Sequence, residues 1–256
     1  MTRIVFMGSP EFAVPVLRTL AAHYEVAGVV TQPDRPAGRG RQLRPPAVKL
    51  AASELRLPIM QPAKLRLPEA MDQLRQWSPE LIAVAAFGQI LRPEVLSLPR
   101  YGCINVHASL LPRWRGAAPI QAVLLAGDSQ TGVTIMQMDQ GVDTGAILAQ
   151  RAIQIGPDAT AGSLSEELST MGSDLLLETL PGYLAGEIHA RRQDEQGATY
   201  APMLKKEDAL LDPARPADEL ARRVRAFNPR PGAYLDWEGD KFKVHMAHAE
   251  EGESAP

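Results

Sequence analysis

Residue types suited to acyl transfer occur in two short segments of the sequence. Asn105 and His107 stand two positions apart, and Asp143 lies inside the stretch Gly141–Gly145. An amide and a protonated imidazole can each donate a hydrogen bond to a carbonyl oxygen that gains negative charge, an interaction on the order of a few kcal/mol. A carboxylate can hold the imidazole in its charged form and take up, directly or through water, the proton that an attacking amine loses. The three side chains therefore suit transfer of an acyl group to an amine.

Structural roles are the alternative for each of these residues. An Asn and a His at the end of a strand often anchor a loop, and Asp is common in turns that contain glycine. Ser109 follows His107 closely, but a hydrolase nucleophile would stand in a G-x-S-x-G pattern, which this segment lacks. We expect no metal site, because Cys103 is the single cysteine and the other histidines lack the spacing of ligands.

Strands and helices alternate in the part of the chain that must position these residues. The expected strands are Arg3–Met7, Val26–Thr31, Leu81–Phe87, Ile104–His107, Val133–Met138 and Ala146–Ile155. The expected helices are Glu11–His23, Ala47–Leu55, Pro68–Trp77 and Ser163–Leu180. A strand, a helix and a second strand in succession form a βαβ unit, from which a parallel sheet follows. Because Leu81–Phe87 is apolar throughout, we place it in the centre of the sheet. The order predicts an α/β fold with an open, mostly parallel, Rossmann-like sheet.

The expected site lies at one edge of this sheet. Open parallel sheets bind ligands beyond the carboxyl ends of their strands. Asn105 and His107 end such a strand and, two positions apart, point to the same face. The loop Asp139–Gly145 follows the strand Val133–Met138, so we expect it to present Asp143 at the same edge.

Nucleotide cofactors are not expected at the first turn of the sheet. A dinucleotide fingerprint needs three glycines after the first strand, and only Gly8 is present there. The phosphate-binding pattern G-x-x-x-x-G-K-[ST] is also missing. An oxidoreductase or a nucleotide hydrolase is therefore disfavoured.

The C-terminal fifth of the chain has a different organisation. A connector over Asp194–Lys206 precedes an expected helix at Pro216–Phe227 and an expected hairpin at Ala233–Val244. We divide the chain into a domain at residues 1–206 and a smaller module at residues 207–256. The tail Ala247–Pro256 is small and acidic, and we expect it to be disordered.

Composition limits the class of protein and its partners. The chain has 256 residues, of which 45% are hydrophobic, and this is enough for a packed core. Its longest apolar runs are too short to cross a bilayer, and its start lacks the pattern of a signal peptide. We expect a cytoplasmic monomer without membrane contact. The net charge is −3, yet Gln32–Lys49 holds five basic residues and one acid. That segment is either a solvated loop or a contact for an anionic backbone.

The site segments resemble those of a known family. Asn105–Pro112 resembles the N-x-H-x-S-L-L-P signature of the folate-dependent formyltransferases, and Gly141–Gly145 resembles their aspartate loop. The resemblance implies the formyltransferase fold, 10-formyltetrahydrofolate as the formyl donor, and catalytic roles for Asn105, His107 and Asp143. It also implies that two segments bind the tetrahydrofolate: Ser109, Leu110, Leu111 and Pro112, with Phe87, Gly88, Gln89, Ile90 and Leu91 in the neighbouring wall.

Three further segments resemble the branch of this family that acts on methionyl-tRNA. They are Met7–Ala13, Thr31–Arg41 and Arg222–Tyr234. The resemblance implies formylation of aminoacylated initiator tRNA for translation initiation, with Arg39, Arg41 and Lys49 as tRNA contacts. It also implies that residues 207–256 begin an OB-like β domain, which this sequence leaves after its first strands. Two other functions remain open: formylation of a sugar or nucleotide amine, and binding of folate or RNA without catalysis.

Overall fold

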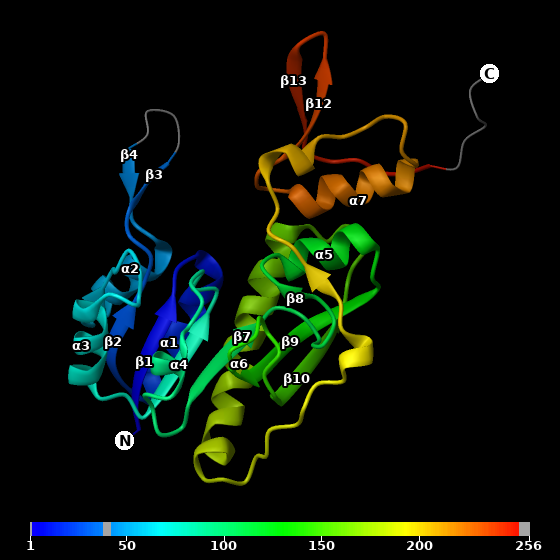
Figure 1. The fold of residues 1–256 in the computed structure, drawn as a ribbon. Helices are drawn as coiled ribbons and strands as arrows, with labels where there is room; N and C mark the ends of the chain where they lie inside the picture. The colour runs from blue at the N-terminus through cyan, green and yellow to red at the C-terminus, as the bar shows by residue number, and fades with distance from the viewer. Residues whose placement is uncertain (1, 38–41, 251–256) are drawn as a thin grey trace.

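A seven-stranded sheet forms the centre of the computed structural model, which describes residues 2–37 and 42–250 (Figure 1). The strand order is β10-β9-β7-β6-β1-β2-β5. The strands are β1 (Arg3–Gly8), β2 (Glu25–Val30), β5 (Ile59–Met60), β6 (Leu81–Ala85), β7 (Cys103–His107), β9 (Gln130–Gln137) and β10 (Ile147–Gln154). Strands β7, β6, β1, β2 and β5 run parallel, and β9 pairs antiparallel with both β7 and β10. The expected open, mostly parallel sheet is confirmed.

Strand β6 occupies the middle of the sheet, as its apolar sequence predicted. All of its residues are buried, because helices cover both faces of the sheet at this point. The strand ends at Ala85 and not at Phe87. The backbone turns away there, since Ala86 has a φ of 46° and Gly88 a φ of 79°.

Helices cover the two faces of the sheet unequally. One face packs against α1 (Val14–His23), α2 (Ala47–Glu54), α5 (Pro119–Ala126) and α6 (Ala161–Leu184). The other face packs against α3 (Pro68–Trp77) and the short α4 (Pro93–Leu96). Side chains alternate along β7, so Ile104 and Val106 enter the first core while Cys103 enters the second. Asn105 and His107 therefore lie on the face of α3 and α4, beyond the end of that apolar cluster.

Asp143 lies beside His107, as expected, but the chain reaches that place by a different route from the expected one. Strand β9 is antiparallel to β7, and its last residue, Gln137, pairs with Ile104 near the start of β7. The loop that follows β9 therefore leaves the sheet at the amino end of β7. It reaches Asn105 and His107 by folding back over the face of the sheet.

Several short elements were not expected from the sequence. The polar segment Gln32–Pro46 contains a ribbon of β3 (Arg35–Ala37) and β4 (Gln42–Arg44). Strand β8 (Arg115–Gly116) pairs with β11 (Tyr200–Ala201), which brings the connector of residues 194–206 back beside the site. The expected helix at Glu11–His23 begins as a 3-10 turn, Glu11–Ala13, before α1.

The C-terminal part has the helix and the hairpin that the sequence predicted. Helix α7 (Ala217–Phe227) lies on α5, and the hairpin pairs β12 (Ala233–Trp237) with β13 (Asp240–Val244). A small third core joins them, formed by Ala209, Leu211, Val224, Phe227 and Ala233. Of the tail, Ala247 packs against this core, whereas residues 251–256 lie outside the described residues. The β3–β4 ribbon and the β12–β13 hairpin project from the same end of the molecule (Figure 1).

None of the helices in the described part of the chain has the length and apolar character of a membrane span.

Candidate active site

The structure brings the three sequence-predicted catalytic residues together. Asn105 donates from Nδ2 to Oδ1 of Asp143 over 3.4 Å, and His107 Nδ1 lies 3.6 Å from the other carboxylate oxygen. Asn105 and His107 are 8% and 5% exposed, and the Asp143 side chain is 15% exposed. An amide, an imidazole and a carboxylate therefore meet in a largely dehydrated place, where hydrogen bonds to developing charge are stronger than in water.

The second nitrogen of His107 faces a main-chain acceptor. Nε2 lies 3.0 Å from the carbonyl oxygen of Trp114, so this nitrogen carries the hydrogen and donates it. The opposite nitrogen faces the Asp143 carboxylate. An imidazolium, which has a donor on each nitrogen, is thus matched on both sides by an acceptor.

Asp143 has an unusual backbone conformation that its neighbours hold in place. Its φ is 53°, in the left-handed region that few non-glycine residues adopt. Its Oδ2 accepts a hydrogen bond of 2.9 Å from the main-chain N–H of Gly116, and its carbonyl oxygen accepts one of 2.8 Å from Gln193. Both ends of the residue are therefore fixed by segments distant in sequence. Such outliers persist only where the surrounding structure over-determines them.

The segment Trp114–Gly116 contacts both titratable members of the site through its backbone. The carbonyl of Trp114 accepts from His107, and the N–H of Gly116 donates to Asp143. Gly116 has a φ of 117°, and a Cβ there would lie 2.5 Å from the carbonyl oxygen of Ala201. Only glycine allows the close approach of β8 to β11 that aims this N–H at the carboxylate.

The predicted donor-binding segment Ser109–Pro112 is packed against the β9–β10 side of the site. Ser109 is fully buried, and its hydroxyl donates to the carbonyl of Arg113 over 2.6 Å. Leu111 packs with Met136 and Ile147, and Leu110 lies against Gly132. Pro112 accepts a main-chain hydrogen bond from Thr199. The described contacts of this segment are thus internal, and they fix the loop that follows β7.

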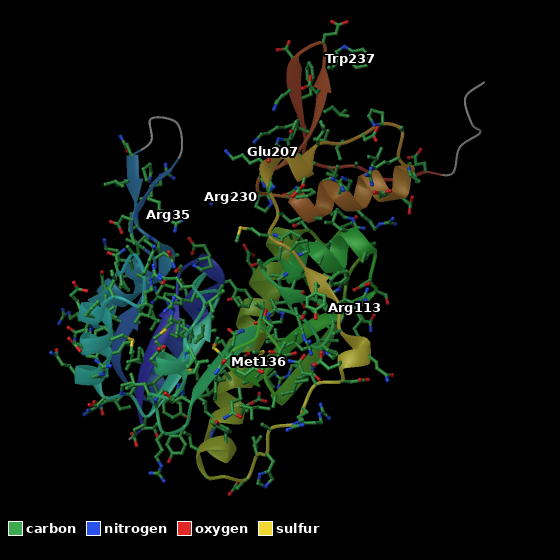
Figure 2. The ribbon with its side chains drawn as sticks, in the orientation of Figure 1. Arg35, Arg113, Met136, Glu207, Arg230 and Trp237 are labelled. Carbon is green, nitrogen blue, oxygen red and sulfur yellow. The ribbon has the colours of Figure 1, made fainter. Side chains whose placement is uncertain are left out.

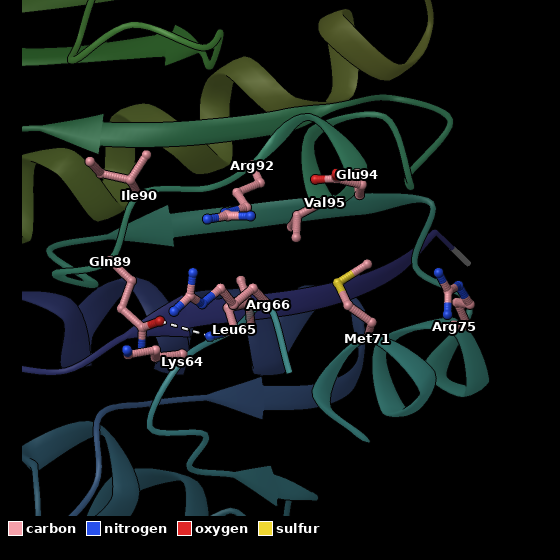
Figure 3. Close-up of a pocket in the computed structure, with 10 residues that line it drawn as sticks. All are labelled: Lys64, Leu65, Arg66, Met71, Arg75, Gln89, Ile90, Arg92, Glu94 and Val95. Carbon is pink, nitrogen blue, oxygen red and sulfur yellow. Dashed lines mark hydrogen bonds between the residues drawn. The ribbon is translucent and has the colours of Figure 1, made fainter. Parts of the chain in front are cut away.

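The second predicted donor-binding segment, Phe87–Leu91, lies on the β6 side of the site and divides into two groups. Phe87 and Leu91 are core side chains, 2% and 3% exposed. Gln89 accepts from the N–H of Leu65 over 2.9 Å and so ties two loops together. Ile90 is 77% exposed, and Gly88 makes the turn before it. Gln89 and Ile90 are the members of this segment that border a cavity (Figure 3).

That cavity has an apolar floor and a basic rim. Its volume is about 350 Å³, and Leu65, Met71 and Val95 contribute its apolar side chains. The basic side chains around it are Lys64, Arg66, Arg75 and Arg92, with Glu94 as the one acid. Arg66 and Arg92 extend toward the side on which Gln89 lies (Figure 3). Arg75 is paired with Asp72 over 2.8 Å, so the rim keeps an excess of positive charge. A small anionic molecule with an apolar part suits this cavity.

Of the predicted tRNA contacts, only Lys49 falls within the described residues. It lies in α2, and its Nζ donates to both carboxylate oxygens of Asp34, over 2.9 and 2.7 Å. Hydrogen bonds from Gln61 and then from Lys49 hold the pKa of the Asp34 carboxyl below its usual value. A phosphate would therefore compete with Asp34 for Lys49. Arg39 and Arg41 lie outside the described residues.

Basic residues also accompany the two projecting ribbons. Arg35 lies on β3, and Arg230 lies in the turn before β12 (Figure 2). Both are exposed, as is Arg44 on β4. This end of the molecule thus carries positive charge on two separate elements.

Sequence reasoning missed the residues that hold the site together. Arg115 donates to Gln193, and Gln193 donates to the Asp143 loop. The segment around Arg115 had no regular pattern in the sequence, and Gln193 carried no signal. The basic cavity residues were also missed, because they come from four separate positions in the chain. Within the described residues, no group of three or more His, Cys, Asp or Glu side chains is arranged to hold a metal ion.

Known families cover most of the chain. The family described as formyl transferase matches residues 2–180, and the formyl transferase C-terminal domain matches residues 203–256. A methionyl-tRNA formyltransferase from Geobacter sulfurreducens is 52% identical over 244 residues, which are 95% of this chain and 77% of that protein. One from Halorhodospira halophila is 55% identical over 96% of this chain and 80% of that protein.

Solved structures of low identity share the fold. A methionyl-tRNA formyltransferase from Clostridium thermocellum has a TM-score of 0.67 at 16% identity, over 99% of this chain and 96% of that one. A sugar N-formyltransferase from a Shewanella species has a TM-score of 0.73 at 18% identity, over 98% of this chain and 100% of that one. The fold is therefore shared by enzymes with different acceptors, and the sequence relatives decide the branch. The chain belongs to the formyl transferase family, in its methionyl-tRNA formyltransferase branch.

Proposed function

We propose that this chain transfers the formyl group of 10-formyltetrahydrofolate to the amino group of methionyl-tRNA, which yields N-formylmethionyl-tRNA for translation initiation in the cytoplasm. One observation carries the proposal: in a chain of this family, Asn105 and His107 converge on the Asp143 carboxylate in a largely buried place. The identity of 52% to a methionyl-tRNA formyltransferase supports the choice of acceptor.

In formyl transfer the protein has two tasks: to donate hydrogen bonds to the formyl oxygen and to provide a path for one proton. The acceptor amine attacks the formyl carbon, a C–N bond forms, and negative charge develops on the formyl oxygen. Asn105 donates one amide hydrogen to Asp143, and its other amide hydrogen can be donated to the formyl oxygen. As the bond to N10 of the folate breaks, the amine loses a proton and N10 gains one. His107 and Asp143 provide the site through which that proton passes.

Two separate cavities suit the two substrates. The cavity at Gln89 and Ile90 has a basic rim, which suits the carboxylate-bearing tail of a folate. A second cavity of about 540 Å³ begins at Ala117 and Ala118, directly after the Gly116 that contacts Asp143. The exposed Met203 supplies apolar surface there, and Arg230 supplies charge. This combination suits an apolar aminoacyl group joined to a phosphate-bearing strand.

The tRNA contacts remain part of the proposal. We assign Arg39, Arg41 and Lys49 to the acceptor arm, since the segment Thr31–Arg41 resembles that of the tRNA enzymes and the basic Lys49 follows it closely in the sequence. Lys and Arg side chains bind the phosphate backbone and release counterions. We also propose that residues 1–206 form the catalytic domain and that residues 207–256 belong to a tRNA-binding module in a monomeric enzyme.

An assay with two alternative acceptors tests which amine the enzyme formylates. The purified chain is incubated with 10-formyltetrahydrofolate and either methionyl-tRNA or an amino-sugar nucleotide, and the blocked amine is identified by mass spectrometry. Formylation of methionyl-tRNA alone supports the proposal. Formylation of the sugar amine would assign the chain to the other acceptor class, and absence of turnover with both would favour a binding protein without catalysis.

A further inference from the structure

A buried arginine lies behind the proposed catalytic residues, and no catalytic step accounts for it. Arg115 is 1% exposed and is among the largest fully buried side chains of the described residues. Its two terminal nitrogens donate to the two carboxylate oxygens of Glu195 over 2.9 and 2.8 Å, and its Nε donates to Gln193 over 3.0 Å. The Glu195 side chain is 71% exposed, so the ion pair runs from the surface to the interior. A guanidinium buried so deeply is costly unless its partners are fixed.

The partners of Arg115 lead directly to the Asp143 loop. Gln193 accepts from Arg115 with its side-chain oxygen and donates from its side-chain nitrogen to the carbonyls of Asp143 and Gly145, over 2.8 and 2.7 Å. One amide group therefore joins the buried arginine to the loop at the strained residue, Asp143, and again two positions after it. Since all three contacts are within normal hydrogen-bond length, the geometry leaves Gln193 little freedom.

The backbone of Arg115 leads to the same two groups by another route. Its preceding residue, Trp114, offers the carbonyl that accepts from His107, and its following residue, Gly116, offers the N–H that donates to Asp143. The N–H of Arg115 itself donates to the carbonyl of Thr199, which holds β8 against the connector. Fixing the Arg115 side chain thus fixes one hydrogen bond to His107 and one to Asp143.

We infer that Arg115 and Gln193 are positioning residues, which set the distance and orientation between His107 and Asp143 while touching neither substrate. The inference rests on the proposed catalytic role of these two residues. Glu195 completes the unit, because it neutralises the buried guanidinium. The Arg115 guanidinium correspondingly holds the pKa of the Glu195 carboxyl below its usual value. Small displacements of reacting groups have large kinetic effects, on the order of 10²-fold for about 1 Å.

The sharpest test is Gln193→Glu, which keeps the size of the side chain and the acceptor for Arg115. It replaces the nitrogen that donates to the two loop carbonyls by an oxygen that repels them. We expect kcat for methionyl-tRNA formylation to fall about 10- to 100-fold while KM for the folate and for the tRNA stays within about twofold. A purely structural role would lower the amount of folded enzyme and leave the kcat of the folded fraction unchanged, so active-site titration accompanies the assay.

A second pair of variants keeps the test informative if Gln193→Glu does not fold. Glu195→Gln and Glu178→Gln each remove the charge of an exposed carboxylate that pairs with an arginine. Glu195 pairs with the buried Arg115, whereas Glu178 pairs with Arg151, whose side chain is 38% exposed. We expect Glu195→Gln to lower kcat and Glu178→Gln to leave it unchanged. Equal kcat values for these two variants and the unmodified enzyme would overturn the inference.

The outcomes also separate this inference from the proposed function. If His107→Ala and Asp143→Asn abolish turnover but Gln193→Glu and Glu195→Gln retain full kcat, only the positioning inference fails. If His107→Ala and Asp143→Asn remain active, the proposed catalytic residues are wrong and the positioning inference fails with them.

Discussion

Asn105 donates a hydrogen bond to Asp143 across 38 residues of sequence, although the strand before Asp143 runs antiparallel to the strand of Asn105. The contact exists because the loop after β9 turns back over the sheet instead of continuing beyond its end. That path is held by the N–H of Gly116 and by Gln193. The catalytic geometry thus depends on segments that do not belong to the sheet.

Alanine at Asn105 or at His107 should remove most of the turnover and leave the fold in place. Asn105→Ala deletes the donor to the reacting oxygen, and the loss of one such donor costs on the order of 10²–10³ in rate. His107→Ala removes the imidazole of the proposed proton path, and general acid–base catalysis contributes about 10²–10⁴ in rate. Neither side chain belongs to the apolar clusters on the two faces of the sheet, so both clusters keep their packing in these variants. Steady-state kinetics and circular dichroism would measure the two effects. Near-normal kcat in either variant would show that the role of that residue has been assigned wrongly.

Asp143→Asn should also lower activity strongly, for a different reason. The amide keeps the shape of the side chain, but it removes the negative charge that faces His107 and introduces an N–H close to the N–H of Gly116. We expect a fall in kcat of about 10²-fold or more. Asp139→Asn is the matched control, because Asp139 lies in the same loop and bonds to Gly141 and Thr144 without touching His107. A similar loss in both variants would point to loop stability as the cause.

Features that depend on neighbouring residues were predictable from the sequence, whereas contacts between residues far apart in the chain were not. The sheet and α3 were predictable because apolar periodicity is a local property, and α3 begins and ends at the expected residues. Asn105 and His107 were found because strand periodicity fixes their common face. The reversal of β9 was not predictable, since strand direction depends on where α5 lies. Arg115 and Gln193 were missed because their pairing spans 78 residues.

Removal of charge from the rim of the Gln89 cavity should weaken binding of the donor. Arg66→Ala and Arg92→Ala each delete one exposed cation, and exposed ion pairs contribute about 0.2–1 kcal/mol. We expect KM for 10-formyltetrahydrofolate to rise by up to about fivefold, with little change in kcat. Arg75→Ala serves as the control, because Arg75 is already paired with Asp72. Equal KM values for all three variants would exclude the rim from donor binding.

Cys103 should resist thiol reagents in the folded protein despite lying two positions from Asn105. Burial raises the pKa of the Cys103 thiol from 9.0 to about 12, because the thiolate would lose its hydration. The thiol is therefore protonated at neutral pH, and labelling should require unfolding. Burial of the neutral thiol therefore contributes fully to the free energy of unfolding below about pH 9, and this contribution is lost as the pH rises toward 12.

Labelling with an aromatic disulfide reagent at pH 8, with and without denaturant, measures the accessibility of Cys103. We expect one reactive thiol per chain in denaturant and almost none without it. Cys103→Ala, which should show none in either condition, is the control. Rapid labelling of the native protein would contradict the buried position of this side chain.

Salt dependence of tRNA binding should separate the predicted phosphate contacts from one another. Each Lys or Arg that neutralises a phosphate adds up to about 0.9 to the slope of log affinity against log salt concentration. Arg39→Ala should flatten the slope by about that amount. Lys49→Ala should flatten it less, because its ammonium already bonds to Asp34, whose release opposes the phosphate contact. Arg18→Ala, which removes a surface cation paired with Glu54, should leave the slope unchanged.

Folate affinity, measured in parallel, should be the same for all variants. Parallel slopes for Arg39→Ala and the unmodified chain would remove the ribbon from the tRNA interface and would favour an amine acceptor without a phosphate backbone.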